Sequence, residues 1–121
     1  MARILIVDDD DAVLATMRKT LERAGHAVTV ASNGEDGLRL FRASPVDLVI
    51  TDLYMPEKEG IETIQDIRAE YPDALILAVS GATVSSGEGP LVDAELFGAN
   101  ASLAKPFSPD ELQRKVEELL G

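Results

Sequence analysis

The sequence predicts an α/β fold with a doubly wound, five-stranded parallel sheet and helices on both faces. Five short apolar runs indicate strands. The first is rich in β-branched residues with little polar alternation, which is typical of a strand covered on both faces, and the fifth is the weakest. Segments with apolar residues at helical spacing separate these runs. About two to six residues connect successive elements, as in right-handed βαβ units. The runs are residues 3–7, 26–31, 46–51, 74–80 and 101–104.

The first helix is expected to follow the strand at residues 3–7 almost directly. Apolar residues recur at helical spacing from Val13 to Ala24, and Gly25 is placed to cap the C-terminus. Either Asp10 or Asp11 can cap the N-terminus, because a short side chain there accepts a backbone N–H that has no partner within the helix.

The second helix is expected to begin near Ser32, which has capping-box spacing to Glu35. Leu38 and Phe41 mark its apolar face. The helix ends before Pro45, since proline disfavours helical backbone in the residue before it.

The third strand, residues 46–51, leads directly into Asp52. Pro56 follows soon after and lacks the N–H that a strand ladder needs. The strand therefore places Asp52 at the edge of the sheet where the carboxyl ends of the strands lie. Taken alone, a carboxylate at this place is either a structural cap on the next turn or a reactive group.

The second half of the chain continues the alternation of strands and helices. Isoleucines spaced through residues 61–67 indicate a third helix that stops before Pro72. The strand at residues 74–80 leads into Gly81–Pro90, which is rich in Gly and Ser and is interpreted as a loop. Residues 91–97 predict a short fourth helix.

A last helix is expected after the strand at residues 101–104. Ser108, Pro109 and Glu111 match a helix start, with serine as the cap, proline at the first position and glutamate at the third.

Composition narrows the function classes. The formal net charge of −11 argues against non-specific binding to nucleic acid and against binding to anionic membrane surfaces. The chain has no cysteine, which excludes disulfides and thiolate metal sites. No apolar run reaches the roughly 18 residues of a spanning helix, and no signal peptide is visible. We expect one cytoplasmic domain over residues 1–121, without an output domain and without a nucleic-acid or membrane partner.

Polar side chains gather where the predicted strands end. Asp8 and Asp9 follow the first strand and Asp52 the third, while Ser80 ends the fourth and Lys105 follows the fifth. The carboxyl ends of parallel strands share one edge of the sheet, where ligands bind in open α/β folds. Three carboxylates there repel one another unless a cation lies between them. Such an oxygen-only set suits Mg²⁺.

Lys105 and Ser80 extend this set toward phosphate chemistry. A lysine is a compact positive charge that can hold a phosphoryl oxygen, and serine adds a hydroxyl donor. Together with a carboxylate nucleophile and a divalent metal they fit phosphoryl transfer. Taken singly, Lys105 could equally be a surface lysine, and Ser80 could be an ordinary hydroxyl at the end of a strand.

Four motifs stand in order at these strand ends. They are Val7-Asp8-Asp9, Thr51-Asp52-Leu53-Tyr54-Met55-Pro56, Ser80-Gly81 and Lys105-Pro106-Phe107. With them the chain resembles the receiver domains of two-component response regulators, the CheY-like family, over essentially all of its length. The resemblance implies the flavodoxin-like form of the fold predicted above.

The resemblance implies that Asp52 accepts a phosphoryl group from a phosphohistidine on a sensor histidine kinase or a histidine phosphotransfer protein. Asp9 and Asp52 would ligate Mg²⁺ together with the backbone carbonyl of Tyr54, and Asp8 would act through a metal-bound water. The domain would then change conformation and alter its binding to a downstream partner, which the sequence does not identify.

By the same resemblance, Lys105 would pair with Asp52 and afterwards with the phosphoryl group, and Ser80 would move toward a phosphoryl oxygen. The peptide bond between Lys105 and Pro106 would be cis. Such a domain phosphorylates and dephosphorylates itself on an aspartate and is not a conventional turnover enzyme.

Two features depart from the family pattern. Ser102 occupies the position three before the lysine, where receiver domains often have an aromatic residue that reports activation. The loop at Gly81–Pro90 is longer than is usual. A degenerate receiver that acts only by docking is the alternative function. A phosphatase of the haloacid dehalogenase type fits less well, because Tyr54 stands where that family needs a second aspartate. The domain would serve as a stand-alone regulator, as a phosphorelay intermediate or as part of a longer protein.

Overall fold

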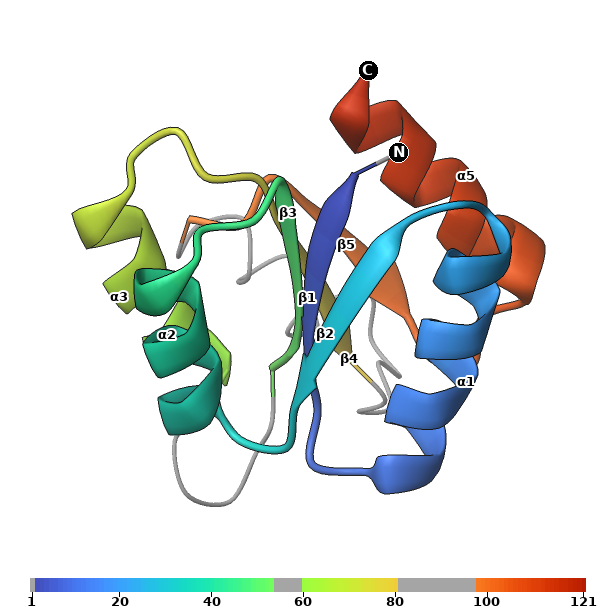
Figure 1. Cartoon of the computed structure of the whole chain (residues 1–121), viewed down its shortest axis with the longest axis horizontal. Helices are drawn as coiled ribbons and strands as arrows, with labels where there is room; N and C mark the ends of the chain where they lie inside the picture. The colour runs from blue at the N-terminus through green and yellow to red at the C-terminus, as the bar shows by residue number, and fades with distance from the viewer. Residues whose placement is uncertain (1, 54–59, 81–97) are drawn as a thin grey trace, which may run out of the picture.

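The computed structural model describes residues 2–53, 60–80 and 98–121 (Figure 1). Over these ranges the chain forms five strands and four helices. They are β1 (Arg3–Val7), α1 (Asp11–Arg23), β2 (Ala27–Ala31), α2 (Gly34–Ala43), β3 (Leu48–Asp52), α3 (Gly60–Glu70), β4 (Ile76–Ser80), β5 (Ala101–Ala104) and α5 (Pro109–Leu120). The loop expected at Gly81–Pro90 and the helix expected at residues 91–97 lie outside the described residues.

The five strands form a single parallel sheet in the order β2-β1-β3-β4-β5. The chain therefore winds outward from β1 in one direction through β2, and in the other through β3, β4 and β5. This is the doubly wound arrangement that the sequence predicted. Because β1 and β3 are neighbours at the point where the winding reverses, their carboxyl ends flank the crevice where ligands bind in such folds.

Helices cover both faces of the sheet (Figure 1), and a cluster of buried apolar side chains lies between the sheet and the helices on each face. Side chains alternate across a strand, so Ile4 and Ile6 of β1 pack with α1 and α5, whereas Leu5 and Val7 pack with α2 and α3. The same alternation runs through β3 and β4. All five residues of β3 and all five of β4 are buried, as expected for central strands of a parallel sheet.

The helix boundaries follow the capping residues. Asp10 is the N-cap of α1, and Gly25 follows its C-cap with a φ of 96°, which glycine adopts without strain. The backbone N–H groups of Gly25 and His26 donate to the carbonyls of Glu22 and Leu21, a Schellman motif. At α5, Ser108 and Glu111 form the predicted capping box.

The capping residue predicted for α2 was wrong by one position. Asn33, not Ser32, is the N-cap, and its side chain accepts the backbone N–H of Asp36 at 2.7 Å. An amide oxygen caps a helix as well as a hydroxyl does, so the asparagine beside the first helical residue takes the role. Strands β2, β3 and β4 also start one or two residues later than the apolar runs indicated.

Arg68 ties the end of α3 to the start of β5. Its guanidinium donates to the carbonyl of Gly98 through Nη2 at 2.8 Å and through Nε at 3.1 Å, and Nη2 also donates to Oδ1 of Asn100 at 2.7 Å. The same Asn100 oxygen accepts the backbone N–H of Ile76 at the start of β4. The planar, multidentate guanidinium thus fixes where the edge strand β5 begins.

Both termini lie at the amino ends of the strands (Figure 1). Ala2 and Gly121 line a common cavity together with His26 and Asp47. The opposite edge of the sheet carries the polar strand ends described below. None of the helices in the described ranges is long and apolar enough to span a bilayer.

Candidate functional site

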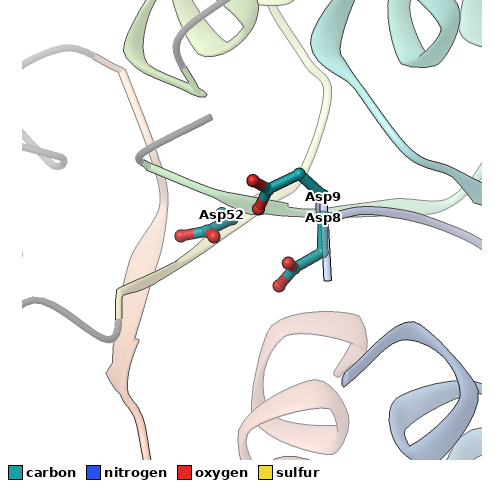
Figure 2. A group of neighbouring side chains, drawn as sticks. All are labelled: Asp8, Asp9 and Asp52. Atoms are coloured by element: carbon teal, nitrogen blue, oxygen red, sulfur yellow. The ribbon is translucent and has the colours of Figure 1, made fainter. Parts of the chain in front are cut away.

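Three carboxylates meet where β1 and β3 end (Figure 2). Asp8 and Asp9 follow β1, and Asp52 is the last residue of β3, whose Thr51 pairs with Val7 of β1. One oxygen from each carboxylate lies within 4.8 Å of the others. Asp8 is fully buried and Asp52 is 7% exposed, whereas Asp9 reaches solvent. The parallel register of two adjacent strands therefore brings these acidic groups together, as predicted.

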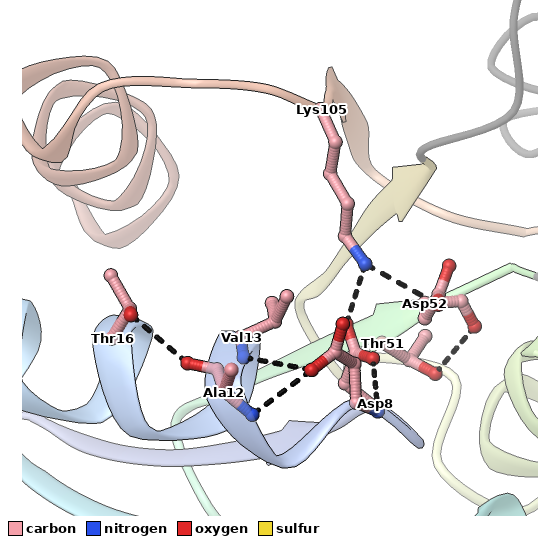
Figure 3. A network of polar contacts seen from close by, with 8 residues as sticks. Asp8, Ala12, Val13, Thr16, Thr51, Asp52 and Lys105 are labelled. Atoms are coloured by element: carbon pink, nitrogen blue, oxygen red, sulfur yellow. Dashed lines mark hydrogen bonds and ion pairs between the residues drawn. The ribbon is translucent and has the colours of Figure 1, made fainter.

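Lys105 reaches into this cluster from the end of β5 (Figure 3). Its Nζ lies 2.7 Å from Oδ2 of Asp8 and 3.4 Å from Oδ2 of Asp52. Burial acts to lower the pKa of Lys105, but the hydrogen bond to Asp8 and the negative charges of Asp52 and Asp8 outweigh it and raise the pKa. The lysine therefore remains fully charged at neutral pH. The expected pairing with Asp52 is present, but Asp8 is the closer partner.

The buried Asp8 is held from two sides. Oδ2 accepts from Lys105, and Oδ1 accepts the backbone N–H of Asp10 at 2.9 Å. Asp10 in turn caps α1, because its Oδ1 accepts the N–H groups of Ala12 at 2.9 Å and Val13 at 3.3 Å. The orientation of Asp8 is thus coupled to the first turn of α1.

The carboxylates and the lysine do not balance in charge. Three ionised carboxylates against one ammonium leave about two negative charges in a small, largely buried space, and such repulsion is costly without a cation. The set contains only oxygen donors, which is the chemistry of Mg²⁺ sites, where one or two carboxylates bind directly and waters complete the coordination. The donor set therefore fits Mg²⁺.

The structure describes three of the remaining predicted site positions, residues 80, 102 and 106. Ser80 is the last residue of β4 and is 1% exposed, next along the strand from Val79, which pairs with Asp52. The peptide bond between Lys105 and Pro106 is cis. Ser102 lies in β5, half-buried and paired with Ala78. Tyr54, whose carbonyl the family resemblance assigns to the metal, lies outside the described residues.

Two residues that contact the backbone of Asp52 or Leu53 were not among the site residues predicted from the sequence. The Thr51 hydroxyl donates to the Asp52 carbonyl at 3.1 Å. Gly60 is the first residue of α3, and its N–H donates to the carbonyl of Leu53 at 2.9 Å. A glycine directly before the periodic isoleucines was the available signal for Gly60. Thr51 stands in one of the four motifs above, but the sequence does not indicate that its hydroxyl contacts the Asp52 carbonyl.

Comparison with known proteins identifies the family. The family model described as "Response regulator receiver domain" matches residues 4–117. The Chemotaxis protein CheY homolog of Campylobacter jejuni is 35% identical over 98% of this chain and 92% of its own length. The transcriptional regulatory protein PhoP of Bacillus subtilis, which regulates alkaline phosphatase synthesis, is 31% identical over 98% of this chain and 48% of its own length.

Solved structures agree with this assignment. A CheY-like receiver domain protein from Methanospirillum hungatei superposes with a TM-score of 0.89 at 31% identity, covering 99% of this chain and 94% of that one. The chemotaxis protein CheY4 of Vibrio cholerae superposes with a TM-score of 0.88 at 28% identity, covering 98% of each chain. The chain spans about half the length of several curated relatives, PhoP among them, and nearly the full length of the CheY homologue.

Receiver domains are signalling domains rather than conventional enzymes. A histidine kinase or a phosphotransfer protein phosphorylates them, and they bind Mg²⁺ at an acidic pocket of the kind formed here by three aspartates. On the family match and the fold, this chain belongs to the response regulator receiver domains, the phosphoacceptor signalling domains of two-component systems.

Proposed function

We propose that Asp52 is the phosphoacceptor of this domain. The observation that carries the proposal is its surroundings: a nearly buried carboxylate at the end of β3, 3.4 Å from the Lys105 ammonium and grouped with two further carboxylates. Asp8 is fully buried and bound to Lys105 and to the backbone of Asp10, so it is less accessible as a nucleophile. Asp9 lies on the solvent side, where it serves as a metal ligand.

In the proposed step, an oxygen of Asp52 attacks the phosphorus of a phosphohistidine on a sensor histidine kinase or a histidine phosphotransfer protein. The new O–P bond forms as the P–N bond breaks, and the electron pair returns to the imidazole nitrogen of the donor. The product is an aspartyl phosphate. Water later cleaves this acyl phosphate, releasing inorganic phosphate and restoring the Asp52 carboxylate.

Lys105 and Ser80 stabilise the transferred group. The Lys105 ammonium already lies between Asp8 and Asp52, so a short movement toward the Asp52 side lets it hold a phosphoryl oxygen. The Ser80 hydroxyl at the neighbouring strand end donates to another oxygen once its strand end moves inward. This movement is the event that alters binding to a downstream protein. Because residue 102 is serine, this conformational change is transmitted through β5 without an aromatic side chain at that position.

Asp9 and Asp52 would hold Mg²⁺ directly, with the Tyr54 carbonyl as a third protein ligand and Asp8 acting through a bound water. Bound there, the dication supplies neutralisation of the charge that the phosphoryl oxygens add to an already acidic site. The domain would meet its phosphodonor in the cytoplasm. Its acidic surface supports a protein partner and not nucleic acid or an anionic membrane.

The test is the intact mass of the protein after incubation with phosphoramidate, a small phosphodonor, with Mg²⁺ and with a chelator. A single phosphoryl adduct is expected with Mg²⁺, and none is expected in Asp52→Asn. Asp11→Asn removes an exposed carboxylate from the first turn of α1 and is expected to react like the wild type. An adduct that persists in Asp52→Asn would place the acceptor elsewhere. A folded wild type without any adduct would instead favour a domain that acts only by docking.

A further inference from the structure

Gly60 lies in direct contact with the backbone of the phosphoacceptor. A Cβ built on this glycine would lie 1.7 Å from the carbonyl oxygen of Asp52, 2.6 Å from its carbonyl carbon and 2.6 Å from Cα of Leu53. Separations below 3.0 Å are essentially never found for real Cβ atoms. The atoms in the way belong to the main chain and cannot rotate aside as a side chain does.

Space, and not backbone conformation, requires glycine here. In the described ranges the glycines with positive φ are Gly25, Gly98 and Gly121, so Gly60 has a backbone conformation that any residue can adopt. What an alanine would lack at this position is room. Glycine allows α3 to begin against the end of β3, with the N–H of Gly60 donating to the carbonyl of Leu53.

The Asp52 carbonyl is therefore held from two directions. Gly60 packs against it, and the Thr51 hydroxyl donates to it at 3.1 Å. Asp52 and Leu53 are also the point where β3 leaves the sheet, since the N–H of Leu53 still donates to the carbonyl of Val79. Any displacement of this peptide moves Cα of Asp52, and with it the carboxylate that faces Lys105.

We propose that Gly60 is a positioning residue for phosphoryl transfer, which sets the place of the Asp52 carboxylate by close backbone contact. This inference rests on the proposed role of Asp52 as the acceptor. An alanine at residue 60 must gain at least about 1.3 Å of separation to reach the 3.0 Å limit. Misplacing a reacting group by roughly 1 Å costs on the order of 100-fold in rate.

The test compares Gly60→Ala with Gly37→Ala, a matched control within α2. A Cβ at Gly37 would lie 2.7 Å from Cγ2 of Val7, so it also meets a crowded neighbour, but that neighbour is a side chain in the core between the sheet and α2. Both variants should lose stability. Only Gly60→Ala should displace the acceptor.

Phosphorylation by phosphoramidate is followed by intact mass across a range of Mg²⁺ concentrations, and urea unfolding gives the folded fraction of each variant. We expect the maximal rate of folded Gly60→Ala to fall about 100-fold, and that of Gly37→Ala to stay within about threefold of the wild type. A wild-type rate in folded Gly60→Ala overturns the inference. So does an equal loss of rate in Gly37→Ala at equal stability, because the rate would then follow stability alone.

Thr51→Val keeps the shape of the side chain but removes the hydroxyl that donates to the Asp52 carbonyl. This variant tests whether contacts to that carbonyl position the carboxylate if Gly60→Ala does not fold. The loss of one hydrogen bond is expected to slow phosphorylation by about fivefold while leaving the apparent Mg²⁺ affinity within about twofold. An unchanged rate in Thr51→Val would then overturn the inference. A wild type that forms no Asp52 adduct would refute the proposed function itself, which is a separate outcome.

Discussion

Replacing Lys105 by methionine tests whether the Lys105 ammonium stabilises the folded protein by offsetting the charge of the acidic cluster when Mg²⁺ is absent. Methionine keeps most of the aliphatic length of lysine but removes the ammonium that lies 2.7 Å from Asp8 and 3.4 Å from Asp52. The fully buried Asp8 then keeps only the backbone N–H of Asp10 among the partners described above. The variant should therefore be less stable than the wild type.

The magnitude follows from the distances and the burial. At an effective dielectric constant of about 20, unit charges 2.7 Å apart attract by roughly 6 kcal/mol, of which the desolvation of both groups cancels a large part. Removing one partner of a buried pair costs about 3–5 kcal/mol. Because 19% of the Lys105 side chain is exposed, we expect a loss near the lower end, about 3 kcal/mol.

The assay is urea unfolding monitored by circular dichroism at pH 7 in a chelator, with the slope of the transition checked for a common two-state process. Lys115→Met is the matched control. Lys115 lies 3.7 Å from the largely exposed Glu118 on α5, and its loss should change the free energy of unfolding by no more than about 0.5 kcal/mol. Equal stabilities of Lys105→Met and the wild type would refute the view that this lysine offsets the carboxylate repulsion.

The ion pair between Lys105 and Asp8 also predicts how the free energy of unfolding depends on pH. The pKa of Lys105 is raised in the folded protein, so its stabilising contribution is fully present below the ordinary value of 10.5 and is lost as the pH rises through the higher folded-state pKa. The difference in unfolding free energy between the wild type and Lys105→Met should stay constant from pH 7 to 9 and shrink above pH 10.5. A difference that already disappears near pH 8 would contradict the raised pKa.

Three further predictions concern the metal site and the helix ends. Asp9→Asn should fold in a chelator at least as stably as the wild type, because one repulsive charge is gone, but millimolar Mg²⁺ should no longer raise its melting temperature. Ser108→Ala should lower the unfolding free energy by about 1 kcal/mol in urea titrations, since it removes the capping box of α5. Arg68→Met should speed hydrogen exchange of the β5 amides relative to those of β1, because the contacts to Gly98 and Asn100 are lost.

Local patterns were sufficient to predict the order of the elements that the structure describes and the edge of the sheet where the acidic cluster lies. Continuous apolar runs indicated buried parallel strands, and this topology alone brings the ends of β1 and β3 together. The carboxylates were identifiable because each follows such a run directly. The cap of α5 was also identifiable, since Ser108, Pro109 and Glu111 act through contacts within one turn.

Features that depend on three-dimensional distance were not predictable in this way. The closer approach of the Lys105 ammonium to Asp8 than to Asp52 depends on how side chains 97 and 53 positions apart along the chain meet in space, which no local pattern encodes. The role of Gly60 depends on how closely α3 approaches β3, and in sequence this glycine resembles any loop glycine. The shift of the α2 cap from Ser32 to Asn33 shows that two adjacent residues with similar capping ability cannot be ranked from sequence.

The position of the chain ends has a consequence for how this domain can be combined with others. The two chain ends lie at the amino ends of the strands (Figure 1), whereas the aspartates and Lys105 stand at or just after the carboxyl ends of β1, β3 and β5. A protein fused to either end, or a tag or surface linker attached there, would begin on the side away from the proposed phosphoacceptor, Asp52. The approach of a phosphodonor and the tethering of a neighbour therefore use separate sides of the molecule, and one need not obstruct the other.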